Sequence, residues 1–154
     1  MIVTTDNDEK TARIQDMAQL ADIKARTLVV PNKGRDILPF MQLFTQGHAD
    51  TRDIWCHVHQ KKSVGTSHAG DVWHAFLMAI LLGDKTRMSS ALEHMQDNTT
   101  GLVAPFDPYW CDWAGSRRLL PHIASKLPGP LPEHLLLFPV GNMFWTRGTV
   151  DEQM

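Results

Sequence analysis

Short apolar runs alternate with amphipathic stretches along the chain, and this alternation predicts its secondary structure. Ile2–Thr5 is a β-branched run followed at once by residues that commonly cap helices. After it, Ile14, Met17 and Ala18 fall at the spacing of a helical stripe. The chain therefore starts as a strand followed by an amphipathic helix.

The same pattern continues to the C-terminus. Strands are expected at Ile2–Thr5, Thr27–Val30, Ile54–His59 and Gly101–Ala104, with one or two more within Leu135–Trp145, and helices around Ile14–Ala21, Ile37–Gln46, Val72–Leu82, Thr86–Met95 and Leu119–Leu127. Val72–Leu82 is apolar nearly all round, so we expect it to be buried. The order of elements predicts an α/β fold with a mostly parallel sheet flanked by helices, in a single domain over residues 1–154.

Composition narrows the class of protein. Of the 154 residues 43% are hydrophobic and 21% charged, which is typical of a globular protein, and a net charge of −2 gives no sign of nucleic-acid binding. The two cysteines, Cys56 and Cys111, form no disulfide framework and suit a reducing compartment. No signal peptide is visible, and the apolar run Ala75–Leu82 is too short to span a bilayer. We therefore expect a cytoplasmic protein.

Polar clusters follow three of the predicted strands. They are Thr5-Asp6, Asn32–Asp36 and His59–Ser63. Parallel sheets bind their ligands outside the carboxyl ends of the strands, where such loops meet. The clusters therefore predict a site for a polar, anionic ligand.

His57 and His59 stand two residues apart on a predicted strand, so their side chains should point to the same face. A metal site would need a third ligand, which the neighbouring sequence does not supply. Lys61 and Lys62 would also place positive charge beside the ion. We predict no metal ligands here, with a histidine-site metalloenzyme as an alternative and a merely packed His57 as the simplest interpretation.

The other clusters each have two interpretations. Lys61, Lys62 and Ser63 form either a solvated loop or a grip for phosphate oxygens. The aromatic loop Phe106–Gly115 either stacks on sugar rings or anchors itself to the core.

The segment Asn32–Asp36 is a strand-to-helix turn in either interpretation. Gly34 should adopt a left-handed conformation, and Asp36 could cap the helix that follows. In the functional interpretation, Arg35 reaches a phosphate or sugar and Asp36 accepts bonds from hydroxyls.

The chain resembles the rhamnan synthesis protein F family in five segments: V-V-P-N-K-G-R-D-I-L-P-F, H-V-H-Q-K-K-S, V-W-H-A-F-L-M-A-I-L-L-G, G-L-V-A-P and F-P-V-G-N-M-F-W-T-R. Their order and spacing agree with the family pattern, and the last of them, Phe138–Arg147, is long and unusual. Lys33 replaces an arginine of that pattern and Gln60 replaces a threonine; the second change removes one hydroxyl contact.

This resemblance implies a glycosyltransferase-type domain in bacterial surface-polysaccharide biosynthesis, with a rhamnan or O-antigen-like product. The layout is similar to the nucleotide-binding half of GT-A enzymes, in which His57–Lys61 would fall where a D-x-D metal motif is expected. The implied donor is a nucleotide sugar, with dTDP-rhamnose expected, and the implied acceptor is a glycan or lipid-linked glycan.

Residue roles follow from the resemblance and from position. The expected catalytic residues are Asp36, His59 and Lys61, and the expected substrate-binding residues are Thr5, Asp6, Asn32, Gly34, Arg35, Lys62, Ser63 and Asn142. His59, Lys61 and Lys62 would neutralise the departing diphosphate in place of a divalent ion. Bound Mg²⁺ or Mn²⁺ is the alternative.

The resemblance also implies that parts of a complete enzyme are missing. Family members have a strand before the one at Ile2, and a general base is expected after the F-W-x-R segment, where only Asp151 and Glu152 follow. We therefore expect a GT-A-like domain truncated at both ends and lacking its first strand, completed by further segments or a partner chain. A non-catalytic nucleotide-sugar or glycan-binding domain is the alternative, and association with the inner face of the membrane remains open.

Overall fold

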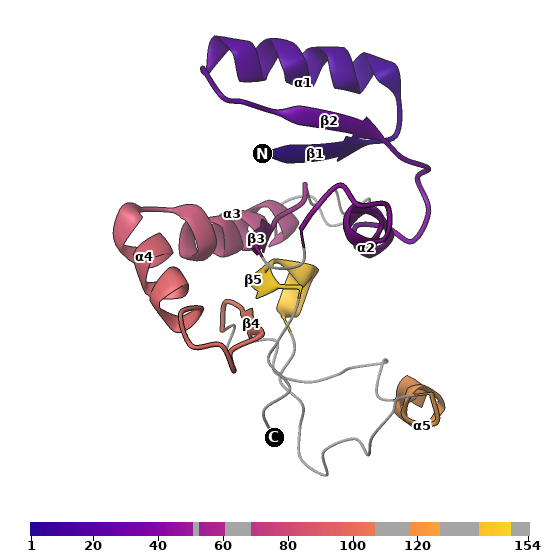
Figure 1. Ribbon diagram of the computed structural model, residues 1–154, viewed down its shortest axis with the longest axis vertical. Coiled ribbons are helices and arrows are strands. Elements are labelled where there is room, and N and C mark those ends of the chain that lie inside the picture. Colours follow the sequence, from indigo (N-terminus) through magenta and orange to yellow (C-terminus); the bar gives the residue numbers. More distant parts are fainter. Residues whose placement is uncertain (51–52, 61–68, 107–117, 127–138, 149–154) are drawn as a thin grey trace.

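The computed structural model describes residues 1–50, 53–60, 69–106, 118–126 and 139–148 (Figure 1). The elements follow one another as β1 (Ile2–Thr5), α1 (Asp8–Leu20), β2 (Arg26–Val29), α2 (Ile37–Thr45), β3 (Ile54–His57), α3 (Ala69–Leu82), α4 (Lys85–His94), β4 (Leu102–Val103), α5 (Leu120–Ala124), a 3₁₀ turn (Val140–Asn142) and β5 (Phe144–Arg147). This order confirms the α/β class that the hydrophobic pattern predicts.

Local sequence signals fix the start of α1. Asn7 is the N-cap, and its side-chain oxygen accepts a hydrogen bond from the Lys10 backbone N–H at 2.9 Å. This satisfies one of the donors that the first helical turn leaves unpaired. Helix α1 then lies along β2 (Figure 1). Its own residue Ala18 is buried.

The strands form two separate sheets, which corrects the expected mostly parallel sheet. β1 and β2 pair in parallel, whereas β3, β5 and β4 form an antiparallel sheet in that order. Among the described residues β3 has β5 as its ladder partner, with His57 opposite Phe144. The apolar strand β5 therefore takes the place beside β3 that the prediction gave to a parallel neighbour.

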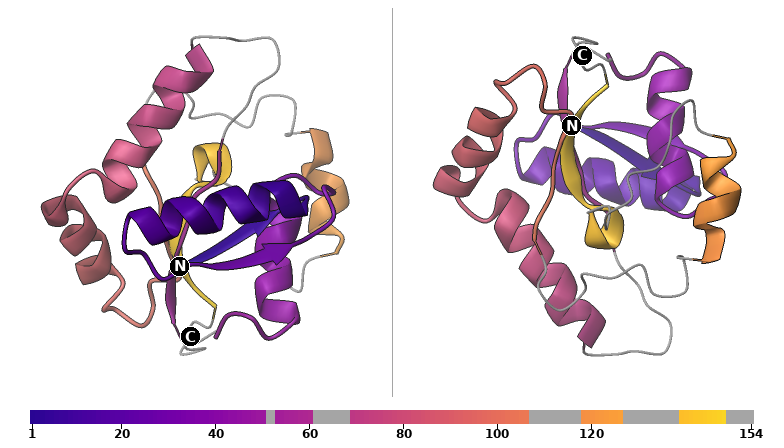
Figure 2. Two further views of the ribbon diagram at one scale, coloured as in Figure 1. Left: turned by 90° about the horizontal axis from the view of Figure 1, so that it is seen from above. Right: turned by 90° about the horizontal axis from the view of Figure 1, so that it is seen from below.

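The β3–β5–β4 sheet lies between two helical layers, with α3 and α4 on one side and α2 on the other (Figures 1 and 2). Since side chains alternate along a strand, His57 and Phe144 face α2, while Cys56 and Trp145 face α3. The buried core lies on the α3 side and consists of Leu77, Leu81, Met95, Met143 and Trp145. A second cluster, the aromatic cluster of Phe40, His57 and Phe144, lies on the α2 side.

Helix α3 buries one face and exposes the other, so the prediction of a helix buried all round is wrong. Leu77 has no exposed surface, but Val72 is 58% exposed. The helix begins at Ala69, before the expected start at Val72, so Asp71 lies in its first turn. The exposure of this apolar outer face was not predicted because the hydrophobic periodicity of a helix does not show how many neighbouring elements cover it.

Of the one or two strands expected within Leu135–Trp145, one is present as β5, which begins at Phe144; residues 135–138 lie outside the described residues. Val140–Asn142 before it is a 3₁₀ turn interrupted by left-handed backbone, since Gly141 and Asn142 have φ angles of 79° and 55°. Within the described ranges, every helix falls short of the length and apolar character that crossing a bilayer requires.

Candidate functional site

Three segments that are far apart in the sequence meet at the imidazole ring of His59. Its Nε2 lies 2.7 Å from the Gly141 carbonyl oxygen and 3.5 Å from Asp36 Oδ2. His59 follows β3, Asp36 precedes α2, and Gly141 lies in the turn before β5. The structure thus joins two of the three polar clusters expected at strand ends.

Asp36 does not cap α2, although it occupies the N-cap position. Its backbone is helical and its side chain makes no capping hydrogen bond. Instead the carboxylate, 16% exposed, turns toward His59, and its Oδ2 is buried with no hydrogen-bond partner among the described residues. Since buried polar atoms are nearly always paired, this oxygen is suited to accept a hydrogen bond that the described residues do not supply.

His57 lies beside this pair, in the aromatic cluster under α2. Its ring centre is 4.3 Å from that of Phe40 and 5.2 Å from that of Phe144, and the residue is 8% exposed. Burial lowers the pKa of His57, and the hydrogen bond with the Asn142 carbonyl only partly opposes this. His57 is therefore a neutral packing residue, as the simplest interpretation of the sequence had it.

His57 and His59 do point to the same face, as their spacing predicts. Their ring centres lie 5.9 Å apart. Among the described residues, however, no three histidine, cysteine or acidic side chains gather closely enough to hold a metal ion.

His74 supports the site from α3, a role that the sequence analysis missed. Its Nε2 donates a hydrogen bond to the His59 backbone carbonyl at 3.1 Å. The only available signal was a polar residue within an otherwise apolar helix, next to Trp73. This bond ties the end of β3 to α3 on the other side of the sheet.

The turns on both sides of His59 contain unusual backbone conformations. Before α2, Gly34 has φ 66° and Arg35 has φ 54°; before β5, Gly141 and Asn142 are also left-handed. Non-glycine residues rarely adopt this region, and such conformations are concentrated at functional sites. The expected left-handed Gly34 is confirmed.

The remaining predicted residues lie at differing distances from this site. Asn142 is exposed and directly follows Gly141, so it borders the site. Thr5 and Asp6 have local partners instead: the Thr5 hydroxyl bonds with Thr11 at 2.9 Å, and Asp6 pairs with Lys10 at 2.6 Å. The Lys10 ammonium lowers the pKa of Asp6, so this carboxylate is ionised and occupied by its own helix.

The remaining predicted residues are Asn32, the cluster Lys61–Ser63 and the aromatic loop. Asn32 is exposed and has no hydrogen bond among the described contacts. Lys61, Lys62 and Ser63 lie outside the described residues, as does the aromatic loop from Asp107 onward. Their proposed roles stay predictions.

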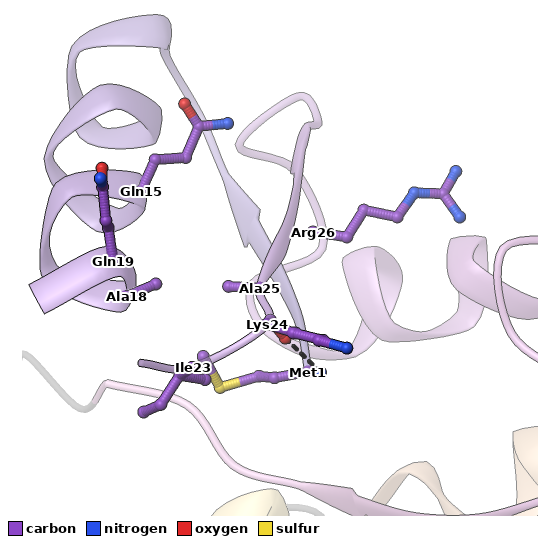
Figure 3. A pocket seen from close by; sticks show the side chains of 8 residues that line it. All are labelled: Met1, Gln15, Ala18, Gln19, Ile23, Lys24, Ala25 and Arg26. Carbon is purple, nitrogen blue, oxygen red and sulfur yellow. Dashed lines mark hydrogen bonds between the residues drawn. The ribbon is translucent and has the colours of Figure 1, made fainter. Parts of the chain in front are cut away.

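Two surface hollows lie away from His59. One, of about 570 Å³, opens between α1 and β2, where the Met1 amino group donates to the Lys24 carbonyl at 3.0 Å (Figure 3). It sits at the start of β1 and β2, opposite their carboxyl ends. The other, of about 460 Å³, runs between α3, α4 and β4 on the far side of the sheet from α2. Neither includes Asp36 or His59.

Comparison with known families defines the class of this protein. The model of rhamnan synthesis protein F matches residues 1–118, so the chain belongs to that family. The match includes Asp36, His59 and His74, while Gly141 and β5 lie beyond it. Membership connects the chain with rhamnan and surface-polysaccharide biosynthesis.

The curated relatives are much longer than this chain. Uncharacterized protein WxcX from two strains of Xanthomonas campestris pv. campestris is 28% identical over 150 residues, which is 96% of this chain and 21% of the relative. The chain thus spans about a fifth of the relatives it matches. No solved structure matches it significantly.

Proposed function

We propose that the chain is a glycosyltransferase-type domain that binds a nucleotide sugar, with dTDP-rhamnose as the expected donor, and transfers the sugar to a glycan or lipid-linked acceptor. The observation that carries this proposal is the meeting of Asp36 and His59 at 3.5 Å. Two family segments, N-K-G-R-D and H-V-H-Q-K-K-S, contribute one residue each to this contact. Family membership supplies the link to a rhamnose polymer.

The chemistry of the site suits a polyhydroxylated, phosphorylated ligand. The buried Asp36 oxygen without a partner is an acceptor for a sugar or ribose hydroxyl. Lys61 and Lys62 come directly after His59-Gln60 in the sequence, and lysines bind phosphate oxygens as point charges. We assign the hydroxyls to Asp36 and the diphosphate to the two lysines.

Titration calorimetry with nucleotide sugars tests this proposal directly. We expect dTDP-rhamnose to bind the 154-residue chain, and Lys61→Ala to weaken it about tenfold or more by removing a charge-assisted contact. Lys126→Ala, a lysine beyond α5, is the matched control and should leave the affinity unchanged. If dTDP-rhamnose, dTDP-glucose, UDP-glucose and GDP-mannose all fail to bind, the donor assignment is wrong.

A chelator separates two ways of stabilising the leaving diphosphate. If the lysines carry this charge, release of dTDP from dTDP-rhamnose in the presence of an acceptor continues in EDTA. Loss of release that Mg²⁺ or Mn²⁺ restores would assign the charge to a divalent ion instead.

A second candidate is a non-catalytic nucleotide-sugar or glycan-binding domain. It is favoured by the chain's span of only about a fifth of its relatives, since residues needed for turnover could lie elsewhere in such proteins. Binding of dTDP-rhamnose without release of dTDP would identify this function.

A further inference from the structure

The hydrogen bonds at His59 determine which ring nitrogen can take up a proton. The Gly141 carbonyl can only accept a hydrogen bond, so the Nε2 at 2.7 Å must carry the hydrogen. In the neutral ring the lone pair then lies on Nδ1. His59 is thus held in the tautomer that presents a basic Nδ1.

Asp36 places a negative charge beside the same ring. Its Oδ2 is 3.5 Å from Nε2 and has no hydrogen bond within the described part of the chain. The carboxylate therefore faces the ring that would become positive when Nδ1 accepts a proton. In the proton transfer Asp36 acts through His59, in addition to the hydrogen bond from a substrate hydroxyl that its oxygen is proposed to accept.

The ring is both fixed and reachable. The His74 side chain holds the His59 carbonyl at 3.1 Å, and the Gly141 carbonyl fixes the ring itself. The His59 side chain is nevertheless 20% exposed, in contrast with the buried His57 next to it. A partly exposed imidazole that is oriented by one hydrogen bond, on a backbone anchored by another, is suited to proton transfer.

We propose that His59 is the proton acceptor of the reaction, an inference that rests on the proposed sugar transfer. The acceptor hydroxyl oxygen forms a bond to the anomeric carbon of the donor. The bond from that carbon to the diphosphate breaks, and its electron pair leaves with the diphosphate. The hydroxyl proton passes to His59 Nδ1, so the ring becomes positive as the leaving group gains negative charge.

The test compares the wild-type chain with His59→Gln and Asp36→Asn, using dTDP-rhamnose as donor and octyl α-L-rhamnoside as acceptor. A glutamine amide can still donate to the Gly141 carbonyl but cannot accept the proton. We expect His59→Gln to bind dTDP-rhamnose within about threefold of wild type while kcat falls at least about 100-fold, the usual size of a general-base contribution. The acid limb of the wild-type pH–rate profile should disappear, a change that a purely structural role would not produce.

Asp36→Asn should lower kcat about tenfold or more and retain the acid limb, since the ring is still present. His122→Gln on α5 is the matched control and should change neither kcat nor the acid limb of the pH–rate profile. A kcat of His59→Gln within threefold of wild type would overturn the assignment while leaving the proposed transfer intact. A wild-type chain that neither binds nor turns over any nucleotide sugar would instead remove the proposed function, and the assignment with it.

A measurement without turnover checks the geometry. ¹⁵N NMR of the imidazoles, with His59 assigned by comparison with His59→Gln, should show the neutral ring protonated at Nε2. A neutral ring protonated at Nδ1 would overturn the proposal whatever the assays give.

Discussion

Gly141 packs directly against Leu77: a Cβ atom at Gly141 would lie 2.7 Å from Leu77 Cδ1. Gly141 also has φ 79°. Both the close contact with Leu77 and the left-handed backbone therefore require glycine at this position, whose carbonyl orients His59. The turn before β5 is thus fixed on one side by the core of α3 and on the other by the site.

Gly141→Ala should therefore destabilise the chain more than left-handed backbone alone requires. Gly47→Ala is the matched control, since Gly47 has φ 70° with nothing within 4 Å of the added atom. We expect a loss of about 1–2 kcal/mol for Gly47→Ala from backbone strain and about 1–3 kcal/mol more for Gly141→Ala from overpacking. Urea unfolding measures both. Equal losses would mean that Leu77 moves aside without cost.

His57 should make stability fall in acid. Burial lowers its pKa in the folded chain, an effect that His59 reinforces and Asp36 opposes. The unfolded chain therefore takes up the proton first as the pH falls below the ordinary histidine value of about 6.5, and the free energy of unfolding decreases. His57→Gln should flatten this dependence in urea unfolding between pH 7 and 5. The exposed His122→Gln should not, and an unchanged slope for His57→Gln would contradict the assignment.

Cys56 should resist alkylation in the folded chain. Burial against the α3 side of the sheet raises the pKa of its thiol to about 11, so the reactive thiolate is scarce at pH 8. In a Cys111→Ser background, Cys56 should react with a disulfide reagent far more slowly in buffer than in 6 M guanidinium. Equal rates would show that Cys56 is accessible.

Leu77→Ala should be among the costly core substitutions. Its side chain has no exposed surface and packs within the core cluster, so we expect a loss of about 2–5 kcal/mol in urea unfolding. Leu20→Ala is the matched control, since Leu20 is 89% exposed; its loss should stay within about 0.5 kcal/mol. A loss of unfolding free energy for Leu77→Ala as small as that for Leu20→Ala would contradict the placement of Leu77 in the core.

Local signals in the sequence predicted most of the elements. The cap before α1 and the left-handed Gly34 follow from neighbouring residues alone, and the limits of α2, Ile37–Thr45, agree closely with the predicted helix Ile37–Gln46. Each of these depends on interactions within a few residues, which a single sequence records.

The pairing of strands was not predictable in the same way. β3 pairs with β5, a strand that comes from far along the chain, and not with a parallel neighbour. The site shows the same limit. Asp36 and His59 were named from polar clusters at strand ends, but Gly141 and His74 contribute through long-range contacts whose partners their local sequence does not identify.

The bond between His59 and Gly141 joins positions 82 residues apart, and this has a consequence for the order of events on the ribosome. A nascent chain can form α1, α2 and α3 early, since helices need only nearby residues, but long-range strand pairing is slow and comes late. The imidazole therefore has no fixed orientation until the turn before β5 has emerged and docked. Any shortened product that stops before this turn would contain Asp36 and His59 without the arrangement that relates them.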